Sequence, residues 1–245
     1  MAYVFNAFAG DKPSVGELLS TRFPHFDAAV VSFTAGQEVV GEGDPTENFF
    51  LVIRGLFRAV KFTRDGRRQV FAFYMPGDIC GLEPEATHKL SIEAVDRAAM
   101  AILPRPACRL QMDVDPRLNA ALFEGATRAL TLSIDHMLMI GRSSAEERLA
   151  WFLTMIRERV APPFGENVVE LAMQRQDIAD YLGLTIETVS RTFTQFKERG
   201  LISLPRKRSV EILRPDALRR LAAADRDAQS IPYPEPARDL AAVAA

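Results

Sequence analysis

Four polar residues between positions 187 and 194 have the types and the spacing of a surface that reads hydrogen-bonding groups. Glu187, Ser190, Arg191 and Thr194 recur at helical intervals, so one face of a helix would carry them all. A carboxylate can accept a hydrogen bond from cytosine N4, and a guanidinium can grip guanine O6 and N7. These residues therefore suit a G·C base pair. The alternative is a surface ion pair, because Glu187 and Arg191 stand at i and i+4.

The surrounding residues 173–200 predict two short helices joined by a tight turn. Their apolar positions share a spacing that points to a common core: Ile178, Ala179, Leu182, Leu184, Val189 and Phe196. The small Ala179 permits close helix approach, Gly183 can adopt the positive φ of a sharp turn, and Thr185 can cap the second helix. This pattern is typical of a helix-turn-helix. It favours base reading by Glu187, Ser190 and Arg191 over the ion pair.

Residues 201–213 predict two strands around a basic turn, which would form a wing beside the second helix. We expect phosphate contacts from this turn and from helix hydroxyls, namely Thr185, Thr188, Thr194, Arg206, Lys207 and Arg208. Residues 171–214 contain eight Lys and Arg against five Asp and Glu, whereas the whole chain carries a net charge of −2. Basic charge is thus concentrated where DNA would lie. A solvated charge run is the alternative.

Residues 116–142 lack internal proline and predict one long helix starting at Asp115 or Pro116. Apolar and small residues recur along it at the spacing of a coiled-coil seam. We expect this seam to pair with a second copy through Leu118, Leu122, Gly125, Ala129, Leu132, His136 and Met139. The alternative is packing against the chain's own strands. Both can hold, because Leu130, Ile134, Leu138 and Ile140 provide further apolar surface.

Residues 28–104 read as short strands separated by glycine turns, with Asp65-Gly66 as a strong hairpin signal. The pattern predicts a compact antiparallel β-roll, whose interior could enclose a small ligand. His88 and Lys89 are expected in a solvated loop. Cys80 and Cys108 are expected as small buried residues. After a hinge at Gly141, we expect Ser144 to cap another amphipathic helix.

The composition argues against several other classes of protein. No apolar run approaches the roughly 20 residues of a membrane helix, and no secretory signal is evident, so we expect a cytoplasmic protein. Two cysteines cannot supply an iron–sulfur cluster, which needs about four thiolates. A cupin-like enzyme on the β-roll is disfavoured because His25, His88 and His136 are scattered. We therefore expect no catalytic activity.

The order of β-roll, long helix and winged helix, over residues 28–215, resembles the CRP/FNR family of bacterial transcription regulators. The motif ETVSR at residues 187–191 is similar to the E-x-x-S-R sequence of the FNR and FixK branches. The segment AEERLAWFL at residues 145–153 looks like the helix that follows the family's hinge. The resemblance implies a homodimeric activator that binds palindromes of the TTGAT-N4-ATCAA type. Glu187, Ser190 and Arg191 would then read bases, and RNA polymerase would be a partner.

Departures from the family narrow this resemblance. Gly81-Leu82 and His88-Lys89 stand where cyclic-AMP-binding members carry their phosphate cassette, and the amino-terminal cysteine cluster of oxygen-sensing members is missing. The remaining likeness is to the FixK group, which implies control of microaerobic, respiratory or nitrogen-fixation genes without a cofactor. An unidentified effector in the β-roll is the alternative. The apolar carboxy-terminal end resembles tags read by ATP-dependent proteases, although a tail without a role is an alternative.

The expected fold class is thus α+β, with a cyclic-nucleotide-binding-like jelly roll, a dimerisation helix and a winged helix-turn-helix. The expected divisions are an arm and β-roll at residues 1–113, the long helix at 114–142, the DNA-binding domain at 143–220 and a flexible tail at 221–245.

Overall fold

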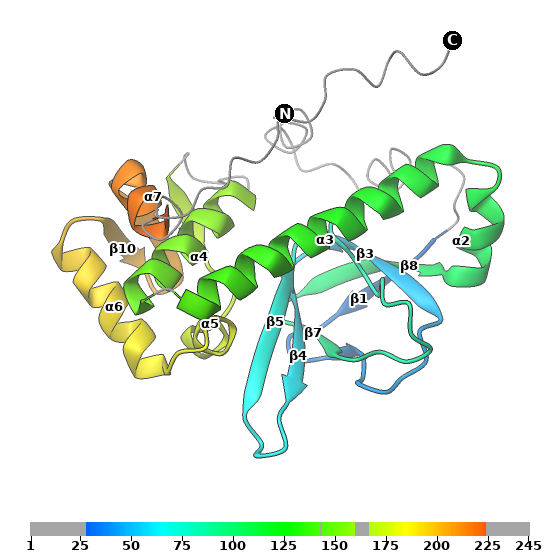
Figure 1. Cartoon of the computed structure of the whole chain (residues 1–245), viewed down its shortest axis with the longest axis horizontal. Coiled ribbons are helices and arrows are strands. Elements are labelled where there is room, and N and C mark those ends of the chain that lie inside the picture. Colours follow the sequence, from blue (N-terminus) through cyan, green and yellow to red (C-terminus); the bar gives the residue numbers. More distant parts are fainter. Residues whose placement is uncertain (1–27, 143, 160–166, 224–245) are drawn as a thin grey trace, which may run out of the picture.

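The computed structural model describes residues 28–142, 144–159 and 167–223. It confirms the predicted fold class: an antiparallel β-roll, one long helix and a winged helix-turn-helix follow one another along the chain (Figure 1). The amino-terminal arm and the carboxy-terminal protease-tag motif lie outside the described residues. Within the described ranges, no helix combines the length and apolarity needed to cross a membrane.

Eight short strands build the β-roll as two four-stranded antiparallel sheets, ordered β1-β8-β3-β6 and β2-β7-β4-β5. Their bounds are β1 (Ala29–Phe33), β2 (Glu38–Val40), β3 (Asn48–Arg54), β4 (Phe57–Phe62), β5 (Arg68–Tyr74), β6 (Ile79–Cys80), β7 (Ser91–Ala94) and β8 (Ala98–Pro104). Phe33 and Phe57 meet edge to face in the core, with ring centroids 5.7 Å apart. The Asp65-Gly66 signal lies at the turn of the β4–β5 hairpin, where Gly66 has φ +79°.

Two helices lead out of the roll: α2 (Arg105–Met112), which the sequence did not predict, and α3 (Pro116–Arg142). Figure 1 shows α3 running lengthwise over the roll toward the carboxy-terminal domain. The side of α3 that faces the chain itself, called the inner face below, consists of the residues of the predicted seam: Leu118, Leu122, Gly125, Ala129, Leu132, His136 and Met139.

Four side chains of the predicted dimerisation seam, those of Leu118, Leu122, His136 and Met139, are buried by the chain itself, which is the alternative considered from the sequence. Leu118 and Leu122 join the apolar core of the roll, and a Cβ on Gly125 would lie 3.2 Å from Ile79 Cδ1. Met139 and His136 are buried beside the carboxy-terminal domain. Coiled-coil spacing thus identified a face that packs largely against the chain itself.

The opposite side of α3, called the outer face below, stays exposed although it is apolar. Its members are Phe123, Leu130, Ile134, Met137 and Leu138, which keep 43–75% of their accessible surface. Some of these residues were expected only as additional apolar surface. Together they form an apolar surface of α3 that is exposed to solvent in the described chain.

The carboxy-terminal domain combines four helices with a small sheet ordered β10-β11-β9. Its elements are α4 (Ala145–Arg159), β9 (Val168–Glu170), α5 (Arg175–Leu182), α6 (Ile186–Glu198), β10 (Ile202–Arg206), β11 (Ser209–Ile212) and α7 (Pro215–Ala223). Ser144 caps α4 as expected, since its hydroxyl accepts from Glu147 N at 3.3 Å while Glu147 accepts from Ser144 N at 2.6 Å. The sequence did not predict β9 or its pairing with the wing.

Two expectations about the roll had different outcomes. Cys80 and Cys108 are buried, as predicted. The expectation that His88 is a solvated loop residue was wrong, because its side chain is 1% exposed and lies 3.5 Å from the Glu83 carboxylate. Backbone hydrogen bonds to Gly43 and Asp44 hold this loop against the roll. Lys89, the next residue, is exposed as expected.

Candidate nucleic-acid interface

The turn between α5 and α6 has the geometry that its sequence predicts. Gly183 ends α5 in the left-handed region, with φ 62° and ψ 40°, which glycine adopts without steric cost. Leu184 N then donates to Ala179 O at 3.0 Å. Thr185 begins the next helix by accepting a hydrogen bond from Thr188 N at 3.2 Å. The two helices are therefore joined by a short turn with both of its ends capped.

One face of α6 is buried and the other is open to solvent. Val189, Phe193 and Phe196 are at most 2% exposed and join the domain core. Glu187, Ser190, Arg191 and Thr194, the residues proposed from their spacing, all lie on the exposed side. The structure thus brings the proposed base-reading residues together on one surface.

The charges on this surface are not paired with each other. Among the described residues, no ion pair joins Glu187 to Arg191, so the surface ion pair considered from sequence is not formed. Hydrogen bonding at the helix start, first from the backbone and then from Thr185, lowers the pKa of Glu187. Its carboxylate is therefore ionised near neutral pH and accepts hydrogen bonds only.

The three threonines expected near the phosphates have different surroundings. Thr185 and Thr188 sit at the start of α6 with their hydroxyl oxygens 3.1 Å apart. Thr194 is exposed one turn further on, and its hydroxyl donates to Ser190 O at 3.2 Å. A neighbouring groove separates the start of α4 from α6 and is lined by Thr188 and Arg191 among others.

The wing carries the predicted cluster of basic residues. Arg206, Lys207 and Arg208 are exposed at the turn between β10 and β11. Arg208 O accepts from Leu171 N at 2.7 Å, and β11 pairs with β9 through Val210 and Val169. The third strand therefore anchors the basic turn to the domain.

Arg175, the first residue of α5, packs against α6, and the sequence reasoning missed it. Its guanidinium carbon lies 3.3 Å from the ring centroid of Phe193 on α6. Burial lowers the pKa of Arg175 to about 10, and within the described residues its buried Nη1 has no hydrogen-bond partner. A desolvated, uncompensated cation at a helix N-terminus invites an anion. The only sequence signal was one arginine at a helix start.

Arg148 of α4 forms hydrogen bonds with the end of α5, next to the turn between α5 and α6. Its Nη1 donates to Leu182 O and its Nη2 donates to Ile140 O, both at 2.9 Å. A positive charge at the carboxyl ends of α5 and α3 complements both helix dipoles. This side chain ties the end of the long helix to the helix-turn-helix.

Two family profiles match the chain over the units just described. Residues 147–221 match the Crp-like helix-turn-helix domain, and residues 30–113 match the cyclic nucleotide-binding domain. These spans include the DNA-facing surface and the β-roll.

Individual relatives agree with this assignment. The chain is 41% identical over 191 residues to the nitrogen fixation regulation protein FixK of Azorhizobium caulinodans, covering 77% of each chain. It is 40% identical over 195 residues to FixK of Bradyrhizobium diazoefficiens, covering 79% of this chain and 82% of the relative. The solved structure of FixK2 from Bradyrhizobium japonicum superposes with a TM-score of 0.75 at 34% identity, covering 80% of this chain and 98% of that one.

A winged helix-turn-helix with an exposed Glu-x-x-Ser-Arg face, joined to a β-roll through one long helix, agrees with these likenesses. The chain belongs to the CRP/FNR family of DNA-binding transcription regulators, in its FixK-like branch.

Proposed function

We propose that two copies of this chain bind a palindrome of the TTGAT-N4-ATCAA type and activate microaerobic, respiratory or nitrogen-fixation genes without a bound cofactor. The observation that carries the proposal is the exposed, mutually unpaired set of Glu187, Ser190 and Arg191 on α6. The relatives named for nitrogen fixation regulation support the choice of genes.

The two charged residues read the bases in this proposal. The Glu187 carboxylate accepts from a cytosine N4 amine, and Arg191 donates two hydrogen bonds to a guanine. Ser190, between them on the same face, donates or accepts with its hydroxyl. Because Val189, Phe193 and Phe196 fix the opposite face in the core, these side chains project from a rigid helix.

Phosphate contacts flank this reading surface. Arg206, Lys207 and Arg208 on the wing neutralise phosphates on one side of the recognition helix, and Thr185, Thr188 and Thr194 contribute hydroxyl groups. Arg175 supplies a further cation whose desolvated guanidinium gains a partner when a phosphate binds. These contacts set affinity and its salt dependence, and they carry little sequence information.

The second copy binds along the outer face of α3. Phe123, Leu130 and Met137 are seven residues apart in succession, so they form one seam of a coiled coil. Ile134 and Leu138 widen this seam. A twofold partner then provides the second recognition helix that a palindrome requires.

Arg191→Ala tests the base-reading assignment. We expect this change to cost about 1–3 kcal/mol per half-site and to relax preference at one G·C position in a binding-site selection. Arg206→Ala should instead weaken binding to all sequences and lower the salt dependence by about one unit of slope. Arg117→Ala, an exposed change at the start of α3, is the control. An unchanged selection profile for Arg191→Ala would refute the assignment.

Activation also requires contact with RNA polymerase. Transcription reconstituted from the purified regulator, polymerase and a promoter carrying the palindrome should rise when the regulator is added. A fall in transcription at that promoter would show a repressor.

A second candidate function is control by a small molecule inside the β-roll. Glu83 Oε2, His88 Nε2 and Arg105 Nε are buried, and none has a hydrogen-bond partner among the described residues. Arg105 reaches this region from α2 and donates to the carbonyl oxygens of Gly81 and Glu83 at 2.5 and 2.8 Å. Calorimetry with candidate nucleotides tests it. Stoichiometric binding that changes DNA affinity would replace the cofactor-free proposal.

A further inference from the structure

The β4–β5 hairpin of the roll forms ion pairs with α5, the first helix of the helix-turn-helix. Arg58 Nη1 lies 2.7 Å from Asp177 Oδ1, and Arg68 Nη2 lies 2.6 Å from the same oxygen. Arg68 also pairs with Asp180 at 2.7 Å. Two strands of one domain thus hold two carboxylates on α5 of the other.

Asp177 has a second role at the start of α5. Its other oxygen, Oδ2, accepts from Gln174 N at 3.0 Å and completes a capping box. The Asp177 side chain is only 3% exposed. One buried carboxylate therefore both starts the helix and receives the hairpin, so a shift of the hairpin bears directly on the first turn of α5.

The ion pairs are well oriented. Arg58 Nε and Nη2 also donate to Glu93 Oε2 at 2.9 and 2.7 Å, which fixes the guanidinium plane. Burial alone would lower the pKa of Arg68, but Asp180 and Asp177 outweigh it and raise that pKa. Partly buried ion pairs add little net stability, yet removing one partner is costly, so such pairs specify an orientation more than they stabilise it.

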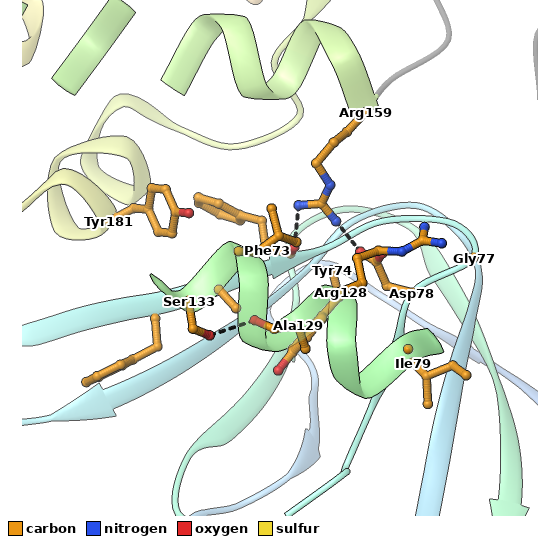
Figure 2. A pocket seen from close by; sticks show the side chains of 14 residues that line it. Phe73, Tyr74, Gly77, Asp78, Ile79, Arg128, Ala129, Ser133, Arg159 and Tyr181 are labelled. Carbon is orange, nitrogen blue, oxygen red and sulfur yellow. Dashed lines mark hydrogen bonds and ion pairs between the residues drawn. The ribbon is translucent and has the colours of Figure 1, made fainter. Parts of the chain in front are cut away.

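Apolar and polar contacts extend the same junction to α4. Phe73 of β5 packs against Tyr181 of α5 and Phe152 of α4, at centroid distances of 5.1 and 6.3 Å. Arg159 at the end of α4 pairs with Asp78 and donates to Phe73 O (Figure 2). A cavity of about 80 Å³ remains between these groups and α3. The roll therefore contacts the DNA-binding domain at both α4 and α5.

This junction sets the orientation of α6, the recognition helix, relative to the roll. The capped turn at Gly183 and Thr185 fixes α6 relative to α5, and the hairpin fixes α5 relative to the roll and α3. In a dimer built on α3, the separation and angle of the two recognition helices set the spacing of the half-sites they reach.

We propose that Arg58 and Arg68 are positioning residues that select the half-site spacing, acting through Asp177 and without touching DNA. The proposal rests on the proposed function, since it requires a dimer that reads two half-sites. It assigns to the β4–β5 hairpin a part in DNA specificity that is separate from any ligand of the roll.

The test is binding-site selection with two half-sites whose spacer is one or two base pairs longer or shorter than the proposed four. The main variant is Arg58→Gln/Arg68→Gln/Asp177→Asn, which removes all three charges together, while the amide oxygen introduced at position 177 still accepts from Gln174 N. We expect the preference for the best spacing over the next to fall by at least about threefold, within the range of coupling between contacting residues. The preferred half-site sequence should not change.

Two further variants separate positioning from general damage. Arg67→Gln makes the same chemical change on the same hairpin, but Arg67 is 83% exposed and, within the described ranges, forms an ion pair with Asp65 alone, so this variant should match wild type. Arg58→Lys/Arg68→Lys keeps both charges but loses the guanidinium geometry, so it should retain more of the spacing preference than the neutralised variant and less than the wild type. If the triple variant melts without a cooperative transition, Asp177→Asn alone, which leaves Arg58 with Glu93 and Arg68 with Asp180, makes the same test.

The outcomes distinguish a failure of the dimeric function from a failure of the positioning role alone. A wild-type protein that shows no preference for paired half-sites would refute the dimeric function on which the proposal rests. A wild-type spacing preference that the neutralised variant shares would overturn the positioning role alone. Relaxed spacing in Arg67→Gln would overturn it too.

Discussion

Leu118, Leu122 and Met139 on the inner face of α3 are at most 7% exposed, whereas Phe123, Leu130 and Met137 on the outer face are at least 60% exposed. Both faces are apolar and both have the spacing of a helix seam. The difference is only in what covers them: the roll and the DNA-binding domain cover one, and nothing in the described chain covers the other. A helix that is apolar on both sides needs two partners.

The outer face gives the largest expected effect. Leu130→Asp/Met137→Asp would introduce carboxylates on both copies into the proposed dimer seam, where burying unpaired charge is prohibitive. We expect monomers on sedimentation and loss of palindrome binding by at least about 10³-fold, the low end of the gap between specific and non-specific binding. Each monomer should still unfold in one cooperative transition, because these side chains are exposed in it.

Ser133→Asp is the matched control for the outer face. It adds a carboxylate to an exposed position on α3 that shares no heptad position with the five outer-face residues, and it should leave the dimer intact. A double-aspartate variant that still sediments as a dimer would move the interface away from this face.

The inner face should respond in the opposite way. Leu118 is 2% exposed within the core of the roll, so Leu118→Ala should cost about 2–5 kcal/mol of unfolding free energy by leaving a cavity. Urea unfolding measures this loss, and sedimentation of the folded protein should still show a dimer. Leu130→Ala, the same change on the outer face, should destabilise the isolated monomer much less.

Two glycine-to-alanine substitutions in α3 compare an open position with one on the packed inner face, because each adds a single methyl group. Gly141→Ala meets nothing within 4 Å, so it should stabilise the helix by about 0.5–1 kcal/mol. At Gly125 the new Cβ would lie 3.2 and 3.3 Å from Ile79 side-chain atoms. We expect the clash to cancel or exceed the helix gain, so that thermal melting ranks Gly141→Ala above wild type and Gly125→Ala at or below it. Equal gains at both positions would contradict close packing of the inner face on β6.

The sequence predicted what depends on local chemistry. Gly183, Thr185 and the exposed face of α6 follow from turn conformation, capping and helical period, which neighbouring residues determine. The inner face was recognised as a seam, but the sequence left open whether a second copy or the chain's own strands cover it, because periodicity reports that a face is buried and not what buries it. Tertiary contacts decided the rest, including the burial of His88, the role of Arg175 and the Asp177 cluster, in which both arginines are more than 100 residues from Asp177.

His136, near the end of the inner face, carries the smallest predicted effect. Its ring stacks on Tyr181 with centroids 4.0 Å apart, and Nε2 donates to Tyr181 O at 2.7 Å. Burial lowers the pKa of His136, against a smaller opposing effect of that hydrogen bond. The folded state therefore binds fewer protons than the unfolded state once the pH falls below about 6.5, the ordinary histidine value.

The sign of the pH dependence follows from that difference. The contribution of His136 to stability is complete above about pH 6.5 and is lost as the pH falls toward the lowered pKa, with a slope below about 1.4 kcal/mol per pH unit, the limit for one proton. His136→Gln keeps a donor for Tyr181 O and removes this titration. Urea unfolding between pH 5 and 7 should therefore show a shallower acid slope for the variant than for the wild type. Parallel slopes would mean that His136 is protonated as readily in the folded chain as in the unfolded one, and that the inner face is open to solvent at its carboxyl end.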